Sequence, residues 1–561
     1  MAFQLSPGVN VSEIDLTTIV PSVATSIGAF AGPFAWGPIG EIITISDEVR
    51  LADTFGKPDS NNYEYWFSAA NFLAYTSNLK IVRAFNITTT RNATANGTGV
   101  LIKNEDDWLE NHSTYADGSY NGFAARYAGE IGNTLKVSMA DANTYATWTY
   151  STQFTSAPGT STFVSNKGGA NDEIHIVVID EDGLFSGSRG TVLEKFSFAS
   201  KASDAKDDSG NTNYYKNVIE NKSKYIHWVS HTTTVAASGT AWGSVANASS
   251  FKSMTANVTV SLSGGVDGTI STANVITGYD SFDPAESVDI SLVVSGPANA
   301  TVATDLISMA ETRKDCVVFL SPEKSDVVDN AGSETTDIKA YRDTLTSTSY
   351  AVLDSNWKYQ YDKYNDVYRW VPLNGDVAGL CARTDLERDP WFSPGGLNRG
   401  IIKNSIKLAW NPTKTNRDDL YVKGINPVVS FQGEGTVLFG DKTLLSKPSA
   451  FDRINVRRLF IVLEKAIARA ARFSLFEFND QFTRAQFVAL VEPFLRDVQG
   501  RRGITDFRVV CDETNNTGEV IDRNEFIGDI YIKPARSINF IQLNFVAVRT
   551  GVSFDEVVGE F

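Results

Sequence analysis

The chain has 561 residues, of which 42% are apolar, and its formal net charge is −16. This length exceeds what one hydrophobic core usually organises, so three or four domains are expected. The acidic balance argues against general nucleic-acid binding, the lack of an apolar run of about eighteen residues argues against a membrane span, and the opening residues lack the features of a secretion signal.

Residues 1–22 are extended and sparsely apolar, with chain breakers at Pro7-Gly8 and Pro21. Val9 and Val11 give a short alternation that is typical of a strand. At about 3.3 Å per residue, such a segment reaches about 60 Å, far enough to touch a neighbouring molecule. The pattern predicts an N-terminal arm, and a frayed terminus is the alternative.

Residues 23–89 alternate between strand and helix patterns, with strands predicted at 26–30 and 79–85 and a helix that begins near Ser46. The same alternation resumes over residues 281–384. There the apolar runs at 290–294, 316–320 and 350–353 predict strands, and residues 302–313 and 337–346 predict helices. Alternation of this kind predicts a mostly parallel α/β sheet, built from both segments.

Residues 90–280 differ in composition from the segments on either side. Ser, Thr, Asn, Gly and Ala dominate, and strand-like runs at 174–179 and 257–262 alternate with turns. We expect one or two β-rich inserted domains that lie on the outside of the molecule and tolerate change.

The last third contains the most regular patterns, over a predicted domain at residues 385–537 and a C-terminal strand arm at 538–561. A helix is predicted over 452–476, and Asn479 or Asp480 caps a second helix. Strands are predicted at 507–511, 527–532 and 538–549. One stripe of the first helix consists of Leu459, Leu463, Ile467, Ala470 and Phe473, and one face of the arm consists of Ile541, Leu543 and Phe545.

A search for catalytic, metal-binding or cofactor-binding residues gives no candidate. His227 and His231 have the spacing of two ligands on a helix, but their neighbours predict a strand and no zincin glutamate is present. The acidic runs at 326–329 and 385–389 match no calcium loop. Gly433 and Gly435 lack the third glycine of a phosphate loop and predict a tight β turn.

The acidic charge is confined to one part of the chain. Residues 385–561 contain 24 Lys and Arg against 23 Asp and Glu, which leaves 26 against 43, a net charge of −17, for residues 1–384. This division fits an acidic outer layer around a neutral inner layer that makes contacts. Cys316, Cys381 and Cys511 are widely spaced, as is typical of reduced thiols in a core.

Short motifs follow one another in a definite order through the last third. They are Ala378-Gly-Leu-Cys-Ala-Arg-Thr-Asp385, Pro390-Trp391, Ser393-Pro394, Gly424-Ile-Asn-Pro427, Leu438-Phe-Gly-Asp-Lys-Thr443, Asn455-Val-Arg-Arg-Leu459, Phe476-Glu-Phe-Asn-Asp480, Val510-Cys-Asp512 and Asn515-Asn516. In this order they resemble the conserved half of contractile tail sheath proteins, particularly those of large contractile-tailed (myovirus-type) phages. The segment Ser6-Pro-Gly-Val-Asn-Val11 resembles the family's opening strand. The resemblance covers about residues 1–90 and 285–561.

The resemblance implies an α+β or α/β multidomain chain, with a sheath core built from its N- and C-terminal parts around the insert. It implies a structural subunit, not an enzyme, that forms hexameric rings in a helical stack around an inner tail tube protein. Its other implied partners are baseplate and tail terminator proteins, with no cofactor, nucleic acid or membrane insertion. Assembly in the host cytoplasm and a place in the virion follow from the same resemblance.

Three alternatives remain open at this stage. The chain could belong to the sheath of a related contractile injection system. A capsid or adhesin subunit could share the polar β-rich insert, although it would not need the ordered motifs. An enzyme with a β-rich accessory domain would need a set of catalytic side chains, which the sequence does not show.

The helix predicted over 452–476 carries six basic residues and few acids. Arg469 and Arg472 are candidates for a contact with an acidic tube. The alternative is that these arginines form ordinary ion pairs within their own domain or with a neighbour's arm, as arginines on helices usually do.

We predict that deletion of residues 1–20 leaves a folded, soluble monomer that no longer polymerises, because the arm contributes strands to neighbouring copies and little to its own core. Circular dichroism and negative-stain microscopy measure the two properties. Normal polymerisation of the shortened chain contradicts the predicted role of the arm.

Overall fold

A computed structural model describes residues 23–112, 119–232, 235, 239–539 and 542. The described residues fall into two units that meet in sequence between Phe473 and Ser474. We call residues 23–473 the large unit and residues 474–542 the small unit. The predicted arm residues Val9, Val11, Ile541, Leu543 and Phe545 lie outside the described residues.

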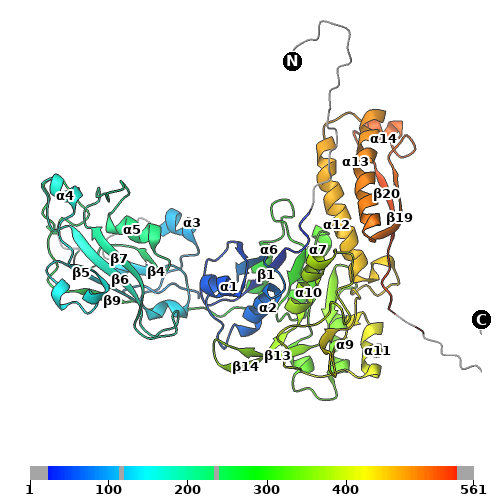
Figure 1. Cartoon of the computed structure of the whole chain (residues 1–561), viewed down its shortest axis with the longest axis horizontal. Coiled ribbons are helices and arrows are strands. Elements are labelled where there is room, and N and C mark those ends of the chain that lie inside the picture. Colours follow the sequence, from blue (N-terminus) through cyan, green and yellow to red (C-terminus); the bar gives the residue numbers. More distant parts are fainter. Residues whose placement is uncertain (1–22, 113–118, 233–234, 236–238, 540–541, 543–561) are drawn as a thin grey trace, which may run out of the picture. The chain divides into compact units, whose positions relative to one another are not determined.

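Seven strands form the central sheet of the large unit, in the order β16-β12-β11-β10-β1-β3-β2. Figure 1 shows the strand β1 of this sheet among helices of the large unit. All neighbours are parallel except β2, which pairs antiparallel with β3. Because β1 pairs with β10, segments on the two sides of the insert form one sheet, as predicted. The strands are β1 Gly28–Gly32, β2 Ile43–Ile45, β3 Leu79–Arg83, β10 Leu292–Val294, β11 Val317–Leu320, β12 Ala351–Asp354 and β16 Ile425–Asn426.

Helices cover both faces of this sheet, which explains why its strands are apolar on both sides. Phe30 of β1 lies in the same core cluster as Trp66 of α2 and Leu380 of α10. Ala29, the preceding residue, lies in the cluster of Tyr279 of α6 and Leu306 of α7. The helices of the large unit outside the predicted insert are α1 Glu48–Phe55, α2 Tyr63–Leu73, α7 Ala300–Arg313, α8 Lys324–Val327, α9 Glu334–Thr344, α10 Asn374–Glu387, α11 Lys414–Val422 and α12 Ile454–Ala471. The helix α6 Thr272–Asp280 lies within the predicted range of the insert, 90–280, but packs against β1 of the central sheet.

Two small sheets complete this part of the large unit. One consists of β13 Trp357–Asp362, β14 Val367–Pro372 and β15 Lys407–Leu408, and the other of β17 Val428–Phe431 and β18 Gly435–Leu438. The turn between β17 and β18 holds Gly433 and Gly435 at φ +85 and +87°. The glycine-rich segment is therefore a hairpin turn, as predicted, and not a phosphate loop.

The insert is β-rich, as predicted from its composition. An antiparallel sheet in the order β7-β6-β5-β9 forms its centre, and β4 pairs with β8 beside it. Its strands are β4 Phe123–Ala125, β5 Leu135–Asp141, β6 Glu173–Asp180, β7 Thr191–Ser200, β8 Ile226–Trp228 and β9 Val258–Ser261. Its helices are α3 Glu105–Asp107, α4 Thr162–Asn166 and α5 Tyr215–Lys222, with further 3₁₀ and π turns.

The long helix α12 is shorter than predicted. It ends at Ala471 and is followed by a 3₁₀ turn at Arg472–Ser474. Leu459, Leu463 and Ala470 are buried as expected. The placement of Phe473 on the buried stripe was wrong, because this side chain follows the helix and is 77% exposed.

The small unit consists of α13 Gln481–Gly500, β19 Ile504–Val510, α14 Gly518–Asp522 and β20 Asp529–Pro534. Asp480 caps α13 by accepting a hydrogen bond of 2.8 Å from the Thr483 amide, so the predicted cap is confirmed. The helix buries Phe487, Val491 and Val498, while Leu490 and Phe494 are only half-buried.

A buried ion pair fixes the three-stranded sheet to the helices of the large unit. The Lys358 ammonium on β13 lies 2.9 Å from the Asp376 carboxylate on α10, and both side chains are fully buried. The Tyr75 hydroxyl donates to the same carboxylate at 3.0 Å and accepts from the Lys403 amide at 2.7 Å. These bonds compensate for the removal of both charges from water.

We predict that Lys358→Met lowers the unfolding free energy by about 3–5 kcal/mol, because Asp376 would remain as an unpaired buried charge. The double variant Lys358→Met/Asp376→Leu should recover most of that loss. Urea denaturation of the unassembled protein measures both changes. Equal stability of the single variant and the natural chain would show that the pair does not constrain this core.

Candidate assembly interface

The position where open α/β sheets usually bind ligands is filled by side chains. It lies at the carboxyl ends of the parallel strands. Ser321 follows β11 and donates to the Asp354 carboxylate of β12 at 2.6 Å, and Asn374 donates to the Ser321 hydroxyl at 3.1 Å. All three side chains are buried, and burial raises the pKa of Asp354 to about 8. These polar groups hydrogen-bond to one another in the interior of the protein.

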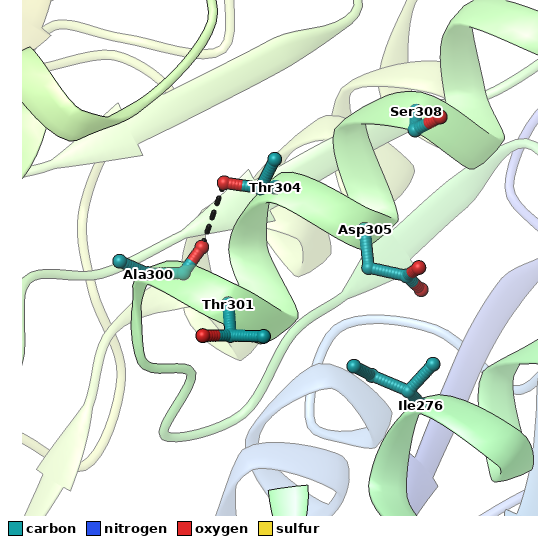
Figure 2. Close-up of a pocket in the computed structure, with 6 residues that line it drawn as sticks. All are labelled: Ile276, Ala300, Thr301, Thr304, Asp305 and Ser308. Atoms are coloured by element: carbon teal, nitrogen blue, oxygen red, sulfur yellow. Dashed lines mark hydrogen bonds between the residues drawn. The ribbon is translucent and has the colours of Figure 1, made fainter. Parts of the chain in front are cut away.

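A shallow hollow lies on the outer side of α6 and α7, lined by Ile276, Ala300, Thr301, Thr304, Asp305 and Ser308. Figure 2 shows that Asp305 is the one acidic side chain among them. The Thr304 hydroxyl donates to the Ala300 carbonyl at 2.7 Å (Figure 2), an ordinary contact within one helical turn. The hollow brings together no nucleophile and general base.

The histidines singled out by spacing do not form a pair of ligands. His227 lies on β8, as predicted, where its Nδ1 is 3.0 Å from Glu220 and its ring stacks on Trp108 at 4.2 Å. The His231 Nδ1 instead lies 2.5 Å from the Tyr215 hydroxyl. Within the residues that the structure describes, no group of three His, Cys, Asp or Glu side chains is placed to hold a metal ion.

The two acidic runs have structural roles. Asp326 accepts the Glu323 amide at 3.1 Å at the start of α8, and burial raises the pKa of Asp326 to about 6. Asp385 accepts a 2.6 Å bond from Arg458 of α12. The three cysteines are buried and unpaired, as predicted, and burial raises the pKa of Cys316 and Cys381 to about 12.

The sheet of the small unit is incomplete. β19 and β20 form an antiparallel ribbon, and no third strand pairs with them among the described residues. Phe507, Val509, Ile530 and Ile532 share one apolar face of this ribbon, yet each is only half-buried. A two-stranded ribbon is marginal by itself, and its packing against α13 leaves these four side chains only half-buried.

The opposite face of the ribbon is polar. Lys533 pairs with Asp506 across the two strands at 2.9 Å, and Tyr531 lies opposite Arg508 and is exposed. Both outer edges of the ribbon present backbone donors and acceptors that no described strand pairs. The ribbon therefore offers two edges to further strands, with an apolar face that additional strands would complete.

The basic residues of α12 are mostly paired within the large unit. The ion pairs are Arg453 with Asp441 at 3.0 Å, Arg457 with Glu464 at 3.2 Å, Arg458 with Asp385 at 2.6 Å, Lys465 with Asp289 at 2.9 Å and Arg469 with Asp289 at 3.3 Å. Arg458 and Asp385 are both buried, so this pair fixes α12 to α10. Arg469 therefore forms an ion pair within its own unit, as the alternative to a tube contact predicts.

Arg472 differs from the other basic residues of this segment. It lies in the turn after α12 and is exposed, as is the adjacent Phe473. Arg469 is also partly exposed, and its bond to Asp289 leaves one edge of the guanidinium at the surface.

No helix within the described ranges is long and apolar enough to cross a membrane.

Two family models match the chain. The phage tail sheath protein central domain matches residues 268–444, and the phage tail sheath C-terminal domain matches residues 446–547. The tail sheath protein of Vibrio phage KVP40 is 34% identical over 99% of this chain and 100% of its own. That of Enterobacteria phage T4 is also 34% identical, over 99% of each chain.

Solved structures show the same fold. The sheath tail protein of Listeria innocua aligns with a TM-score of 0.53 at 11% identity, over 92% of this chain and 94% of its own. The helical sheath of the anti-feeding prophage in its contracted state aligns with a TM-score of 0.52 at 13% identity, over 97% and 99%. These likenesses confirm the predicted α/β multidomain fold class.

Proposed function

This chain belongs to the phage tail sheath family, and we propose that it polymerises as stacked six-fold rings around the inner tail tube and contracts to drive the tube through the host envelope. As a member of that family it is a structural component of the virion and not an enzyme. Its further proposed partners are the baseplate and tail terminator proteins, which bind the two ends of the stack. We propose that the sheath assembles in the host cytoplasm.

The incomplete ribbon of the small unit carries this proposal. β19 and β20 have open edges and a half-buried apolar face. The sequence provides strand-like arms at both ends of the chain, with Val9 and Val11 in one and Ile541, Leu543 and Phe545 in the other. Arms from neighbouring copies add strands to the ribbon and complete its apolar layer.

Strand addition between copies also explains how a polymer remains connected while it shortens. Main-chain hydrogen bonds of an added strand keep their geometry when the two domains that they join rotate as rigid bodies. The contact joins different surfaces of two copies, and such a contact generates a helical stack where its rotation does not close. Contraction releases free energy because subunit contacts in the contracted state are more favourable, and no nucleotide is consumed.

The insert takes the outer radius of the sheath in this proposal. The net charge of −17 in residues 1–384 lies on the part of the chain that includes the insert, while the last third is balanced. A highly charged outer layer keeps a large assembly soluble, and a balanced inner part avoids repulsion between copies.

We predict that the chain with an affinity tag between Ser203 and Gly210 forms tubes in negative-stain microscopy. Gold-labelled antibody should decorate the outside of the assembled tail at nearly the level seen on the free monomer, because the insert faces solvent. Tubes that do not bind the antibody would contradict the placement of the insert. A chain that stays monomeric under all assembly conditions would contradict the polymer itself.

The tube contact is proposed at the C-terminal end of α12, through Arg472 and the exposed edge of Arg469. Charged contacts at a surface are weakened by salt and by water. Such contacts suit a sheath that must release its tube during contraction, whereas a large buried apolar contact would hold the tube in place.

We predict that Arg469→Glu/Arg472→Glu abolishes sheath assembly that purified tube nucleates, at low and high salt, while sheath-only polymer still forms. Asp289→Ala is the matched control, since it removes the partner of Arg469 without reversing charge and should leave templating unchanged. Unchanged templating by the double variant would remove this segment from the tube contact and leave α13 as the next candidate.

A further inference from the structure

One face of the three-stranded sheet in the large unit carries a group of aromatic side chains at the surface. Tyr359 and Tyr361 of β13 lie opposite Trp370 and Tyr368 of β14, and Lys407 of β15 lies opposite Tyr359. The ring centres of the two aromatic pairs are 4.6 and 5.3 Å apart. We call these five residues the aromatic platform.

The aromatic platform is open to solvent. Tyr361 and Tyr368 have exposed fractions of 47 and 54%, and the adjacent Val367 is 40% exposed. Single exposed apolar residues are common on proteins, but a contiguous group marks an interaction surface. Tyrosine and tryptophan are also enriched at the centres of protein interfaces, where their rings supply much of the binding free energy.

The opposite face of the same sheet holds the platform in place. Lys358, Gln360 and Asp362, which alternate with the tyrosines of β13, are all buried. The Asn71 side chain of α2 donates to Gln360 at 2.9 Å, and the Arg369 guanidinium donates to Asp362 at 2.8 Å. Because the rings stand on a fixed backbone, a partner that binds them loses little free energy to ordering this surface.

Lys407 gives the platform a positive charge. Its ammonium lies 4.9 Å from the ring centre of Tyr359 and 5.4 Å from that of Trp370. No carboxylate of the described chain forms an ion pair with it, and the nearby Asp366 accepts the Tyr361 hydroxyl at 2.7 Å. Stacking on the rings leaves the ammonium charged and available to an acidic partner. The platform therefore fits a surface that brings a carboxylate to Lys407.

The hollow on the outer side of α6 and α7 has the complementary charge. It has a volume of about 530 Å³, and Figure 2 shows Asp305 of α7 directed toward Ile276 of α6. Burial, together with the carboxylates of Asp280 and Asp283, raises the pKa of Asp305. Within the described ranges, no Lys or Arg forms an ion pair with any of these three acids. A cation brought into the hollow would relieve their repulsion.

Other acidic side chains of the large unit already have partners. Asp337 accepts the Asn330 side-chain amide at 2.8 Å, Asp326 accepts the Glu323 amide at 3.1 Å, and Asp289 pairs with Lys465 at 2.9 Å. The α6–α7 hollow thus combines an apolar wall with acids that have no cationic partner, which is the chemistry that the platform requires.

The two surfaces belong to one chain but do not meet within it. Figure 1 shows β13 and β14 away from α6 and α7 in the large unit, so a chain does not seat its own platform in its own hollow. In a polymer of this chain, every copy presents both surfaces to other copies. A contact between two different surfaces of identical subunits can be repeated along the whole assembly.

We propose that the aromatic platform of one copy docks on the α6–α7 hollow of a second copy, with Lys407 beside Asp305. This inference rests on the proposed polymer and adds a contact between large units to the strand addition of the small units. Burial of the rings stabilises the contact, and the opposite charges set its orientation.

Charge exchange tests the proposed pair of surfaces. Lys407→Asp and Asp305→Lys should each lower the yield of sheath about tenfold, because like charges then face one another, and the double variant should restore it. The matched control is Lys414→Asp/Asp418→Lys, since both residues are exposed on α11, and this variant should assemble normally. Failure of the double variant to restore assembly, or an equal loss in the control, would overturn the proposal.

Crosslinking between different chains tests the same contact with the charged pair intact. Chains with Val367→Cys, beside the platform, are mixed with chains that carry Thr301→Cys, in the hollow, and assembled. The three natural cysteines are buried, so a short bismaleimide should join the two added thiols into mixed pairs in sheath and not in monomer. Val422→Cys, 81% exposed on α11, replaces Val367→Cys in the control. Absence of mixed pairs in intact sheath, or equal yields with the control, would contradict the contact.

The outcomes separate this inference from the proposed function. Tyr361→Ser/Tyr368→Ser should leave the circular dichroism spectrum and Tm of the monomer unchanged while the yield of sheath falls. Normal assembly of this and all other platform variants would keep the polymer and overturn this contact alone. A natural chain that never polymerises would overturn both. Protection of the Val367→Cys thiol only after tube is added would assign the platform to the tube and also overturn the proposal.

Discussion

The narrow ribbon of the small unit is the constraint on which the account depends. A sheet of two strands leaves both edges without strand partners among the described residues, and packing against α13 leaves its apolar face only partly covered. Phe507, Val509, Ile530 and Ile532 are half-buried for this reason. The large unit has the opposite character, since helices cover both faces of its seven-stranded sheet. The central sheet of the large unit is covered by its own helices, and in the proposed polymer the ribbon of the small unit accepts further strands.

This difference between the two units fits a subunit that must rotate within an assembly without unfolding. In the large unit, the buried pairs of Lys358 with Asp376 and of Arg458 with Asp385 hold the sheet, α10 and α12 together. Loss of one partner would leave a buried charge, so these elements resist deformation. In the small unit, the edges of β19 and β20 that no described strand pairs serve as attachment points in the proposed polymer. A rigid body with adaptable attachments can rotate as a whole, which is how large assemblies usually change state.

Much of the fold follows from local pattern, and the exceptions have physical reasons. Apolar runs such as that of β11 predict buried parallel strands because both faces of the sheet are covered. Asp480 and the Gly433–Gly435 turn were predictable because caps and turns depend on single residues. Phe473 was misplaced because helical periodicity continues past the point where the backbone leaves the helix. The ion pair of Arg469 gives no local signal, because its partner Asp289 lies 180 residues away in the sequence.

Hydrogen exchange of the ribbon amides tests the central claim most directly. If arms from neighbouring copies extend the ribbon, the outward-facing amides of β19 and β20 gain hydrogen-bond partners on assembly. We expect them to exchange at least tenfold more slowly in intact sheath than in the monomer, while amides in β10 and β11 of the covered central sheet change little. Equal exchange of the β19 and β20 amides in monomer and sheath would show that the ribbon edges are not the sites of assembly.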